Sequence, residues 1–450
     1  MSGIALVLAK RGARVTGSDL KESRYSRALE AAGVPVAIGH RAENLGAPEI
    51  VVVSSAIPDT NPEVVEANRL GIPIWPRARM LAHLAGGRST IAVAGTHGKT
   101  STSSMTATML SGMGLDPTFL IGGEVCGFDT NAINGSGEYY VVEADESDGS
   151  FVFLDPHVAI VTNIEADHLD HYGTLEHVEN AFVEFMGRVD PQGAVVVWGD
   201  SPRAVALARQ AGRTVLTYGF ADGCDVRCRV TGREGIGTRF EVTFPDGQVV
   251  TSVTQVPGDH MALNGTASLA CAFFLGLDVT AAAAALKGFC GVRRRFDLVG
   301  KVGGVTVVDD YAHHPTEVRA TLLAAQALDF RRVVVLFQPH RYSRTEALAE
   351  EFGDAFVNAD KVAFMDVYSA GEPPIPGVSG KTLLEEVLEQ HPRAQAAYLP
   401  HRDDVVAFLA SRCRPGDLLL TMGAGDVTTV GPEVVRELAA IDAAGGARCQ

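Results

Sequence analysis

A glycine-rich turn between an apolar stretch and a helical stretch is the segment best suited to chemistry. Thr90–Ala94 is a short apolar run of strand type, and Ser101–Leu110 has the composition of a helix. The turn between them consists of Gly95, Thr96, His97, Gly98, Lys99 and Thr100. A turn of this kind directs backbone N–H groups and the positive end of a helix dipole at one point. The turn, together with Ser101, is therefore predicted to cradle the phosphates of a nucleotide.

Two side chains of the turn add to this prediction, and one neighbouring residue departs from the common pattern. Lys99 supplies a mobile positive charge, and Thr100 supplies a hydroxyl group suited to Mg²⁺. A chance Gly-Lys-Thr in a surface loop is the alternative, but the flanking strand and helix favour nucleotide binding. The eight-residue phosphate-loop pattern has Gly where Val93 stands. The turn is therefore expected to be shorter on its N-terminal side than in common GTPases and kinases.

Clusters of metal-capable side chains follow two further apolar strands. Glu138–Val142 runs into the acidic sequence Glu143–Asp148, and Val158–Thr162 runs into Asn163–His171, which contains His168. Carboxylates downstream of a phosphate loop are where a metal ligand is expected. As solvated loops these clusters would be unremarkable, but their shared position after strands favours a metal site.

The last third of the chain repeats this arrangement, because each expected strand ends in polar residues. These strands are 305–308, 333–337 and 418–422, followed by DDYAHHP, QPHRYSR and GAGD. Such delivery of polar groups is typical of an open parallel sheet. Arg341 and Arg344 offer planar forks suited to phosphate or carboxylate. The run Arg293–Arg295 is either a solvated charged stretch or an anion contact beside a domain boundary.

The first segment, residues 1–88, alternates helical and strand-like stretches, which suggests a small doubly wound α/β unit. Such units bind ligands beyond the C-terminal ends of their strands, where Ser18, Asp19, Ser54 and Ser55 fall. As ordinary loop residues these serines would mean little. The segment opens on the helix-like stretch Ser2–Lys10, without the strand and Gly-rich turn that precede such a helix in a dinucleotide-type unit.

Size and composition describe an acidic globular protein of several domains. The 450 residues are 46% apolar and 20% charged, which is too much core-forming chain for one domain. The net charge of −16 argues against non-specific nucleic-acid binding. There is no run of eighteen apolar residues and no start of signal-peptide type, so we expect a cytoplasmic protein without membrane association. The odd and scattered cysteines favour free thiols over a zinc site; they are Cys126, Cys224, Cys228, Cys271, Cys290, Cys413 and Cys449.

Taken together, the motifs resemble those of the Mur ligases, the ATP-dependent ligases of peptidoglycan precursor synthesis. The motifs span nearly the whole chain and are MSGIA, VSSAI, AGTHGKTS, EADESD, TNIEADHLD, DDYAHHPTE, FQPHRYSRT and GAGD. The resemblance implies three α/β domains. They are a Rossmann-like UDP-substrate domain over 1–88, a central ATPase with a mostly parallel sheet over 89–292, and a Rossmann-like C-terminal domain over 293–450.

Within this family the chain is most similar to the member that joins L-alanine to the lactyl carboxylate of UDP-N-acetylmuramate through an acyl phosphate. The implied cofactors are ATP and Mg²⁺, and the implied partners are small molecules, with the chain a monomer or a weak homodimer. A ligase that recycles a whole peptide onto UDP-N-acetylmuramate is one alternative, and a non-catalytic nucleotide-binding relative is another. The His-Arg-Tyr-x-Arg order in FQPHRYSRT favours the alanine-adding enzyme.

The resemblance also implies roles for individual residues. ATP would contact Gly95, Thr96, His97, Gly98, Lys99, Thr100, Ser101, His260, Asn264 and Arg295. The Mg²⁺ ligands would come from Thr100, Glu143 and His168. UDP-N-acetylmuramate and alanine would contact Ser18, Asp19, His40, Ser55, Tyr311, His313, Arg341 and Arg344. The groups implied in catalysis are Lys99, Glu143, His168, Arg295 and His313, the last as a base for the amine proton.

The sequence departs from the family pattern at two places. The family's N-terminal strand and Gly-rich turn, which would hold the UDP pyrophosphate, are expected just before Met1, so the given sequence is expected to be trimmed or its start codon to have been placed late. Several sister ligases use a carbamylated lysine near a second Mg²⁺. No lysine occurs between Lys99 and Lys287, so another ligand or water is expected there.

Overall fold

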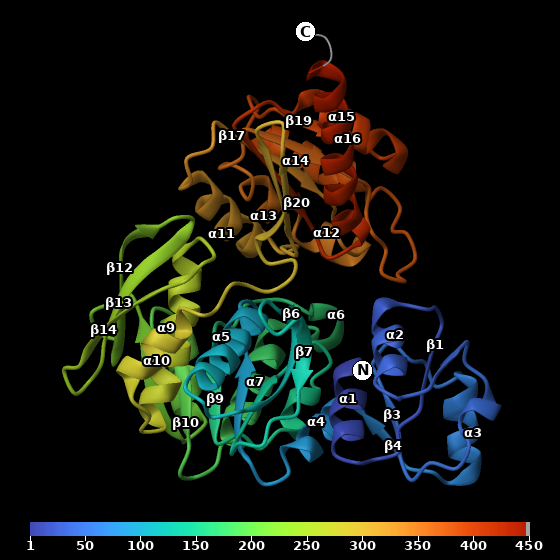
Figure 1. Ribbon diagram of the computed structural model, residues 1–450, viewed down its shortest axis with the longest axis vertical. Coiled ribbons are helices and arrows are strands. Elements are labelled where there is room, and N and C mark those ends of the chain that lie inside the picture. Colours follow the sequence, from blue (N-terminus) through green and yellow to red (C-terminus); the bar gives the residue numbers. More distant parts are fainter. Residues whose placement is uncertain (447–450) are drawn as a thin grey trace. The chain divides into compact units, whose positions relative to one another are not determined.

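The computed structural model describes residues 1–446, apart from the side chains of residue 170 and of residues 444–446. Cys449 lies outside the described residues. The chain divides into two compact units, each taken by itself below (Figure 1). The first unit comprises residues 1–231, 239–253 and 262–290, and the second comprises residues 232–238, 254–261 and those from 291 onward.

The N-terminal part of the first unit consists of short strands and helices in alternation. Its elements are α1 (Ser2–Lys10), β1 (Gly17–Asp19), α2 (Arg24–Ala31), β2 (Val36–Ile38), η1 (Ala42–Asn44), β3 (Val51–Val53), α3 (Pro62–Leu70), β4 (Ile74–Pro76) and α4 (Arg77–Ala85). The strands form two separate parallel pairs, β1–β2 and β3–β4. Helix α3 has clear sequence signals at both ends, because Asn61 caps it, Pro62 opens it and Gly71 ends it in a left-handed conformation.

The rest of the first unit is built on a ten-stranded sheet with the order β14-β13-β12-β11-β10-β9-β5-β8-β6-β7. Its strands are β5 (Ser89–Ala94), β6 (Thr118–Val125), β7 (Thr130–Ile133), β8 (Tyr139–Glu143), β9 (Val158–Val161), β10 (Ala194–Trp198), β11 (Thr214–Gly219), β12 (Val226–Glu234), β13 (Gly237–Thr243) and β14 (Val249–Val253). Strand β5 pairs in parallel with β8 and β9. Strand β12 joins this sheet by pairing in parallel with β11, whereas β13 and β14 pair in the antiparallel direction.

Helices cover both faces of this sheet, which explains the continuous apolar runs of its central strands. The helices and turns are η2 (Ser150–Phe153), α5 (Lys99–Gly112), α6 (Leu169–Tyr172), α7 (Leu175–Gly187), α8 (Pro202–Gln210), α9 (Asp259–Phe274) and α10 (Val279–Leu286). Helices α4, α7 and α8 share one core with alternate residues of the central strands. Helix α5 packs against β5, β6 and β8, and α10 packs against α5.

The start of α9 differs from the sequence-based expectation. The sequence suggested that His260 and Asn264 precede a helix beginning at Thr266, whereas α9 begins at Asp259 and contains both residues. Gly265, directly before the expected start, is a packing position within the helix. A Cβ atom at Gly265 would lie 2.9 Å from the Cζ atom of Phe240, so the helix has room only for glycine there.

The second unit contains a six-stranded sheet with the order β15-β16-β20-β17-β18-β19. Its strands are β15 (Asp297–Val302), β16 (Val305–Asp310), β17 (Arg332–Phe337), β18 (Lys361–Phe364), β19 (Ala396–Tyr398) and β20 (Asp417–Met422). Its helices are α11 (Pro315–Gln326), α12 (Tyr342–Ala347), α13 (Ala349–Gly353), α14 (Gly380–Gln390), α15 (Arg402–Arg412), η3 (Asp426–Thr429) and α16 (Val430–Gly446). Only the edge pair β15–β16 is antiparallel among the paired strands of this sheet. Residues of α11 and α14 pack into one core, and residues of α15 and α16 pack into another.

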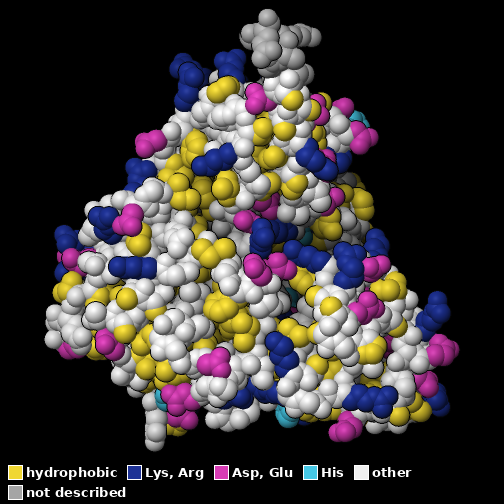
Figure 2. All heavy atoms as spheres, in the orientation of Figure 1, with side chains coloured by type: hydrophobic (Ala, Val, Ile, Leu, Met, Phe, Trp, Pro, Cys, Tyr) yellow, Lys and Arg dark blue, Asp and Glu magenta, His cyan; other side chains and the backbone are white. Residues whose placement is uncertain are grey.

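The surface is mixed in charge. On the face seen in Figure 2, Lys and Arg side chains are interspersed with Asp and Glu side chains. Within the described part of the chain, no helix combines the length and the apolar character needed to cross a lipid bilayer.

Candidate active site

The predicted phosphate loop connects the end of β5 to the start of α5, and both of its glycines are required. Gly95 has a φ of +130°, and a Cβ atom there would lie 2.1 Å from Oγ1 of Thr162. Gly98 has a φ of +82°, and a Cβ atom there would lie 3.0 Å from Oδ1 of Asn264. These backbone conformations and close approaches leave no room for a side chain. The loop is thus held in one conformation by its neighbours.

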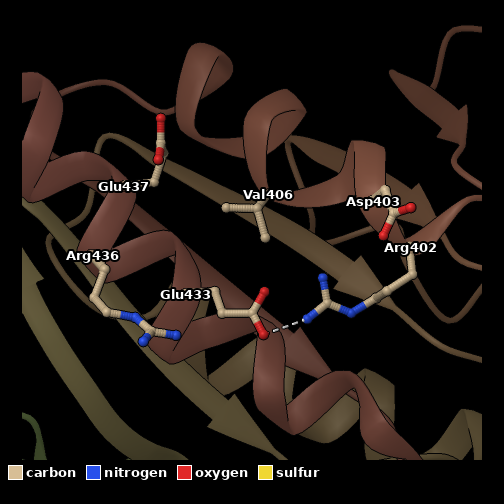
Figure 3. A pocket seen from close by; sticks show the side chains of 6 residues that line it. All are labelled: Arg402, Asp403, Val406, Glu433, Arg436 and Glu437. Carbon is tan, nitrogen blue, oxygen red and sulfur yellow. Dashed lines mark hydrogen bonds and ion pairs between the residues drawn. The ribbon is translucent and has the colours of Figure 1, made fainter.

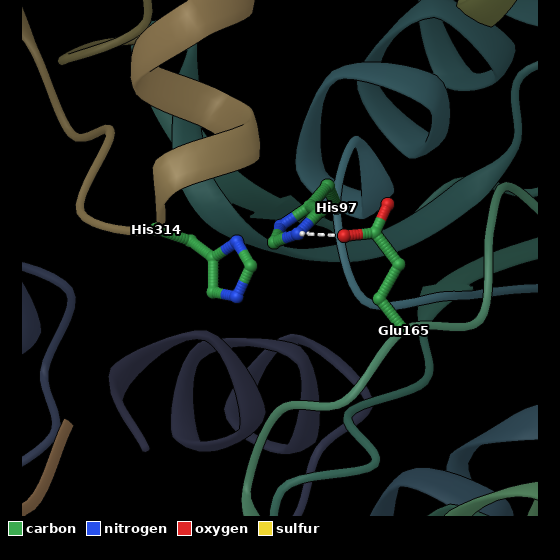
Figure 4. A group of neighbouring side chains, drawn as sticks. All are labelled: His97, Glu165 and His314. Atoms are coloured by element: carbon green, nitrogen blue, oxygen red, sulfur yellow. Dashed lines mark ion pairs between the residues drawn. The ribbon is translucent and has the colours of Figure 1, made fainter. Parts of the chain in front are cut away.

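The segment that follows β9 fixes the outer side of this loop. The backbone N–H of Glu165 donates to Oγ1 of Thr96 at 2.9 Å, and the backbone N–H of His97 donates to Oδ1 of Asn163 at 2.8 Å. The hydroxyl group of Thr162 donates to the carbonyl oxygen of His97. Figure 4 shows the ion pair between Nε2 of His97 and Oε2 of Glu165, which are 3.4 Å apart. The two sequence motifs therefore form one structure.

Lys99 is held by three acceptors at the start of α5. Its Nζ atom donates to the carbonyl oxygens of Gly95 at 2.6 Å and Thr96 at 3.2 Å, and to Oε1 of Glu146 at 2.7 Å. Burial alone would lower the pKa of Lys99, but the acidic groups around it, with Glu146 foremost, raise that pKa above its usual value. Burial raises the pKa of Glu146, whose side chain is 2% exposed, and the charge of Lys99 opposes the rise. Lys99 is therefore a charged group whose partner is a carboxylate within the protein.

Glu146 was not singled out by the sequence. It lies in the acidic cluster after β8, but nothing in its spacing separates it from its neighbours Asp145 and Asp148. The fold of the turn after β8 places Glu146, and not its acidic neighbours, in hydrogen-bond contact with Lys99, which lies 47 positions earlier in the chain.

The residues predicted to bind metal fall into two groups. Oγ1 of Thr100 donates to Oε1 of Glu143 at 2.9 Å, and Oε2 of Glu143 accepts from the backbone N–H of Gly122 at 2.7 Å. Nε2 of His168 lies instead 3.8 Å from Oε1 of Glu146. Hydroxyl and carboxylate oxygens are hard donors of the kind that Mg²⁺ prefers, so Thr100 and Glu143 fit that ion.

The remaining residues predicted to bind ATP lie around the loop or in the second unit. Ser101 is buried in the first turn of α5, and Asn264 of α9 faces Gly98. His260 belongs to the second unit, as does Arg295. Exclusion of water around His260 lowers its pKa to about 4, and the charge of Arg295 acts in the same direction.

In the N-terminal part, three predicted substrate residues lie near the ends of β1 and β2. Oγ of Ser18 is 2.9 Å from Nδ1 of His40, and the Ser18 hydroxyl donates to Oε2 of Glu63 at 2.8 Å. Asp19 ends β1, and its carbonyl oxygen accepts from the backbone N–H of Gly39. The sequence analysis missed Glu63, because the signals at the start of α3 marked a helix and not a site.

Ser55 was predicted to share this substrate pocket, and the structure places it elsewhere in the first unit. It lines a cavity of about 30 Å³ together with Arg77, Glu143, Asp145 and Asp148, among other residues. This neighbourhood links Ser55 to the acidic cluster after β8.

In the second unit, Tyr311 and His313 follow β16. Nδ1 of His313 is 3.0 Å from the carbonyl oxygen of Tyr311 and 3.4 Å from Oε2 of Glu317. The guanidinium of Arg295 lies 5.1 Å from the centre of the Tyr311 ring and 3.4 Å from Oε1 of Glu317. Asp310 was not singled out. Its burial raises its pKa to about 6, against the charge of Arg295.

The polar residues after β17 gather beside this group. Nη1 of Arg344 lies 3.4 Å from Nδ1 of His340, whose ring stacks on Tyr368 with a centroid distance of 5.7 Å. The rings of His340 and His313 are 5.8 Å apart. Burial lowers the pKa of His340 to about 4, with further lowering by Arg344 and Arg341. The structure thus brings Tyr311, His313 and both arginines together, with His340 and Tyr368 as additional members.

The three consecutive arginines serve different purposes. Arg294 is structural, because its guanidinium donates to the carbonyl oxygen of Gly423 at 2.6 Å and lies 3.3 Å from Oδ2 of Asp309. Arg293 is exposed and lies 3.7 Å from Asp297. Arg295, described above, faces Tyr311.

A separate hollow lies between α15 and α16. It has a volume of about 420 Å³ and is lined by Arg402, Asp403, Val406, Glu433, Arg436 and Glu437. Arg402 donates to Oε1 of Glu433 at 2.8 Å, as Figure 3 shows. None of the residues that the sequence singled out lines this hollow.

Three family models match successive parts of this chain. Residues 1–89 match the Mur ligase family, catalytic domain; residues 93–272 match the Mur ligase middle domain; and residues 294–425 match the Mur ligase, glutamate ligase domain. A UDP-N-acetylmuramate–L-alanine ligase of Pelotomaculum thermopropionicum is 48% identical over 439 residues, covering 97% of this chain and 95% of that protein.

Two solved structures are similar over almost the whole chain. The UDP-N-acetylmuramate–alanine ligase MurC of Thermotoga maritima has a TM-score of 0.82 and 28% identity, covering 98% of this chain and 96% of its own. A murein peptide ligase of Psychrobacter arcticus has a TM-score of 0.72 and 26% identity, with the same two coverages. These matches confirm the predicted α/β fold and ligase class, and the chain belongs to the Mur ligase family.

Proposed function

We propose that this chain joins L-alanine to the lactyl carboxylate of UDP-N-acetylmuramate, using ATP and an acyl phosphate, in peptidoglycan precursor synthesis. The observation that carries the proposal is the phosphate loop, in which Lys99 lies at the start of α5 beside the Thr100–Glu143 pair. The identity of 48% to a relative of that name supports the choice of substrates.

The nucleotide is assigned to the N-terminus of α5. The phosphates of ATP lie against the backbone N–H groups of the loop and the positive end of the helix dipole. Lys99 exchanges Glu146 for phosphate oxygens when the nucleotide binds. Thr100 and Glu143 would hold Mg²⁺, with His168 beside Glu146 as the third predicted ligand, and the ion would supply positive charge that offsets the charge of the phosphates.

The first chemical step needs shielding of charge and no base. An oxygen of the lactyl carboxylate, already deprotonated, attacks the γ-phosphorus of ATP, and the bond to ADP breaks. Lys99 and Arg295 reduce the repulsion between the carboxylate and the phosphate it approaches, which is catalysis by positioning and electrostatics. In the second step, the neutral amine of alanine attacks the acyl carbon, and inorganic phosphate leaves.

The residues after β16 and β17 are assigned to the amino acid. Arg341 and Arg344 have the planar forks that recognise a carboxylate. The carbonyl oxygen of Tyr311 can only accept a hydrogen bond, so Nδ1 of His313 carries the hydrogen in their 3.0 Å contact. The lone pair of the neutral His313 imidazole then lies on Nε2, which takes the proton released by the attacking amine.

The UDP moiety is assigned to Ser18, Asp19 and His40, near the ends of β1 and β2. We propose a division into domains at residues 88 and 292, which would give the UDP-substrate, the nucleotide and the amino acid a segment each. We also propose a cytoplasmic location and a monomer or weak homodimer.

A substrate competition assay tests this function against the peptide-recycling alternative. Purified protein receives ATP, Mg²⁺, UDP-N-acetylmuramate and either L-alanine or a tripeptide that begins with L-alanine, and the products are identified by mass. We expect the alanine adduct and stoichiometric phosphate, with turnover of the tripeptide at least about a hundredfold slower. Preferential use of the tripeptide would assign the chain to the recycling ligases, and the absence of both products would favour a non-catalytic relative.

A further inference from the structure

Glu63 joins three segments of the N-terminal part through one carboxylate. Its Oε2 accepts the hydrogen bond from Ser18 of β1, and its Oε1 accepts from Nδ2 of Asn44 at 2.9 Å and from the backbone N–H of Arg41 at 3.3 Å. Nδ2 of Asn44 also donates to the carbonyl oxygen of Gly39, which fixes the orientation of that amide. Every member of this cluster therefore has a defined role as donor or acceptor.

The cluster determines which nitrogen of His40 carries hydrogen. A carboxylate can only accept, so the single hydroxyl hydrogen of Ser18 points to Glu63. In the 2.9 Å contact between Ser18 and His40, the hydrogen must then come from Nδ1 of His40. A neutral imidazole with hydrogen on Nδ1 has its lone pair on Nε2.

We propose that Glu63 is a positioning residue that, through Ser18, holds neutral His40 with hydrogen on Nδ1, so that Nε2 accepts a hydrogen bond from the uridine moiety of the substrate. The proposal rests on the proposed function for its ligand but not for its proton arrangement. Nε2 of His40 has no hydrogen bond within the described residues, so this acceptor is open to a ligand. The ribose hydroxyls and the N3–H of uracil are the donors that uridine offers.

Replacement of Glu63 by glutamine reverses this chain of donors and acceptors. The carbonyl oxygen of the new side-chain amide is retained by the two donors Asn44 and Arg41, so its NH₂ group faces Ser18 and donates to it. The Ser18 hydroxyl then turns its hydrogen to Nδ1 of His40, and the hydrogen of His40 moves to Nε2. The variant thus presents a donor where the wild-type protein presents an acceptor, with almost no change in side-chain volume.

The tautomer is measured by nitrogen NMR on protein carrying ¹⁵N-labelled histidine. The His40 signals are assigned by their loss in His40→Gln, at about pH 8.5, two units above the ordinary histidine pKa of about 6.5. We expect the lone-pair nitrogen to be Nε2 in the wild-type protein and Nδ1 in Glu63→Gln. A lone pair on Nδ1 in the wild-type protein, or the same tautomer in both proteins, would overturn the proposal.

Steady-state kinetics then test the consequence for the substrate. Glu63→Gln should raise KM for UDP-N-acetylmuramate at least tenfold and leave kcat within about twofold, since the site lies apart from the reacting groups. Glu66→Gln is the matched control, because it makes the same change one turn along α3, in an exposed pair with Arg69. The control should leave both constants and the tautomer unchanged, and an equal KM effect in both variants would contradict a role specific to Glu63.

Competition with UDP analogues identifies the donor. UDP, 2′-deoxy-UDP and a UDP methylated at uracil N3 are compared as competitors of UDP-N-acetylmuramate. The wild-type protein should lose affinity for one analogue, and Glu63→Gln should lose that discrimination. Equal discrimination in the two proteins would contradict the proposal. Failure of the wild-type protein to use UDP-N-acetylmuramate would reject the proposed function, whereas the NMR result tests the proton arrangement by itself.

Discussion

The phosphate loop and the C-terminal ends of β16 and β17 both present positive charge, but they hold it differently. At the loop, Lys99 is neutralised by a buried carboxylate, Glu146, and by two backbone carbonyl groups. At the C-terminal sheet, Arg341 lies 3.9 Å from Glu372, a carboxylate more exposed than Glu146, and burial lowers the pKa of His340 to about 4 with further lowering by Arg344 and Arg341.

This difference indicates what each site does when its ligand arrives. Under the proposed function, Lys99 exchanges Glu146 for a phosphate oxygen, so the backbone of the loop must already be in place. Under the same proposal, the C-terminal arginines gain an amino-acid carboxylate beside Glu372, so affinity there depends on individual side chains. The four predictions below test the comparison in order of expected effect.

The largest effect is expected for Lys99→Ala. Removal of the charge that faces the phosphates should slow phosphate release by about a hundredfold to a thousandfold, the roughly 2.7–4 kcal/mol typical of one lost electrostatic contact. Circular dichroism should show an intact fold. Lys381→Ala, which removes an exposed lysine paired with Glu385, is the control and should retain activity. Normal phosphate release by Lys99→Ala would remove the loop from the reaction.

Gly95→Ala tests whether the loop is fixed by packing. The added Cβ atom meets Oγ1 of Thr162 at 2.1 Å at a φ of +130°, so the protein should lose about 3 kcal/mol or more of unfolding free energy and bind ADP at least tenfold more weakly. Gly212→Ala separates the effect of the positive φ from the effect of the close contact, because Gly212 has a φ of +70° but open space around it. That control should lose only about 1 kcal/mol and keep its ADP affinity. Equal behaviour of the two variants in calorimetry would refute the packing argument.

Asp310 should make the second unit more stable in mild acid. Its pKa is raised from 3.8 to about 6 by burial, so the folded state binds the proton more tightly than the unfolded state. The contribution of this group to unfolding free energy should therefore fall as pH rises from about 4 to 6, by up to about 3 kcal/mol. Because the side chain at position 310 cannot titrate in Asp310→Asn, the unfolding free energy of the wild-type protein should fall more steeply between about pH 4 and 6 than that of the variant. Denaturant unfolding at several pH values measures this difference. A difference that does not change with pH would contradict the raised pKa.

Arg344→Gln should have the smallest effect, confined to the amino acid. Loss of the guanidinium group, with its charge and its paired hydrogen-bond donors, should raise KM for alanine about tenfold and leave KM for ATP unchanged. Because Arg344 contributes to the lowering of the His340 pKa, that pKa should rise in the variant. Kinetics and an NMR titration of His340 measure the two effects. Arg402→Gln, which breaks the ion pair between Arg402 and Glu433 in the hollow between α15 and α16, is the control. It should change neither the alanine kinetics nor the pKa of His340. Unchanged alanine kinetics in Arg344→Gln would remove this residue from the substrate site.

Sequence reasoning worked best where the site is contiguous. Gly95, Gly98, Lys99 and Thr100 are adjacent in the chain, and the flanking strand and helix have clear apolar patterns, so the loop could be predicted as a unit. The strand ends at residues 337 and 422 could be predicted for the same reason, whereas β16 runs two residues beyond its predicted end at 308 because Asp309 and Asp310 are buried within the sheet.

The parts that sequence reasoning missed depend on contacts between distant segments. Glu146 meets Lys99 across 47 positions and Glu63 meets Ser18 across 45, and neither glutamate differs in pattern from its acidic neighbours. The start of α9 at Asp259 was also missed, and the glycine at position 265 is explained by the nearby ring of Phe240 in β13. Which acidic residue meets a distant partner, and which glycine is required, depends on tertiary packing that cannot be read from a single sequence.

The central claim is that the lactyl carboxylate is activated as an acyl phosphate. The most direct test uses UDP-N-acetylmuramate with both carboxylate oxygens replaced by ¹⁸O, together with ATP, Mg²⁺ and L-alanine. One labelled oxygen should appear in the released phosphate for each turnover, and the other should remain in the new amide. Phosphate without label, released in step with ligation, would contradict the acyl phosphate and the roles assigned to Lys99 and Arg295.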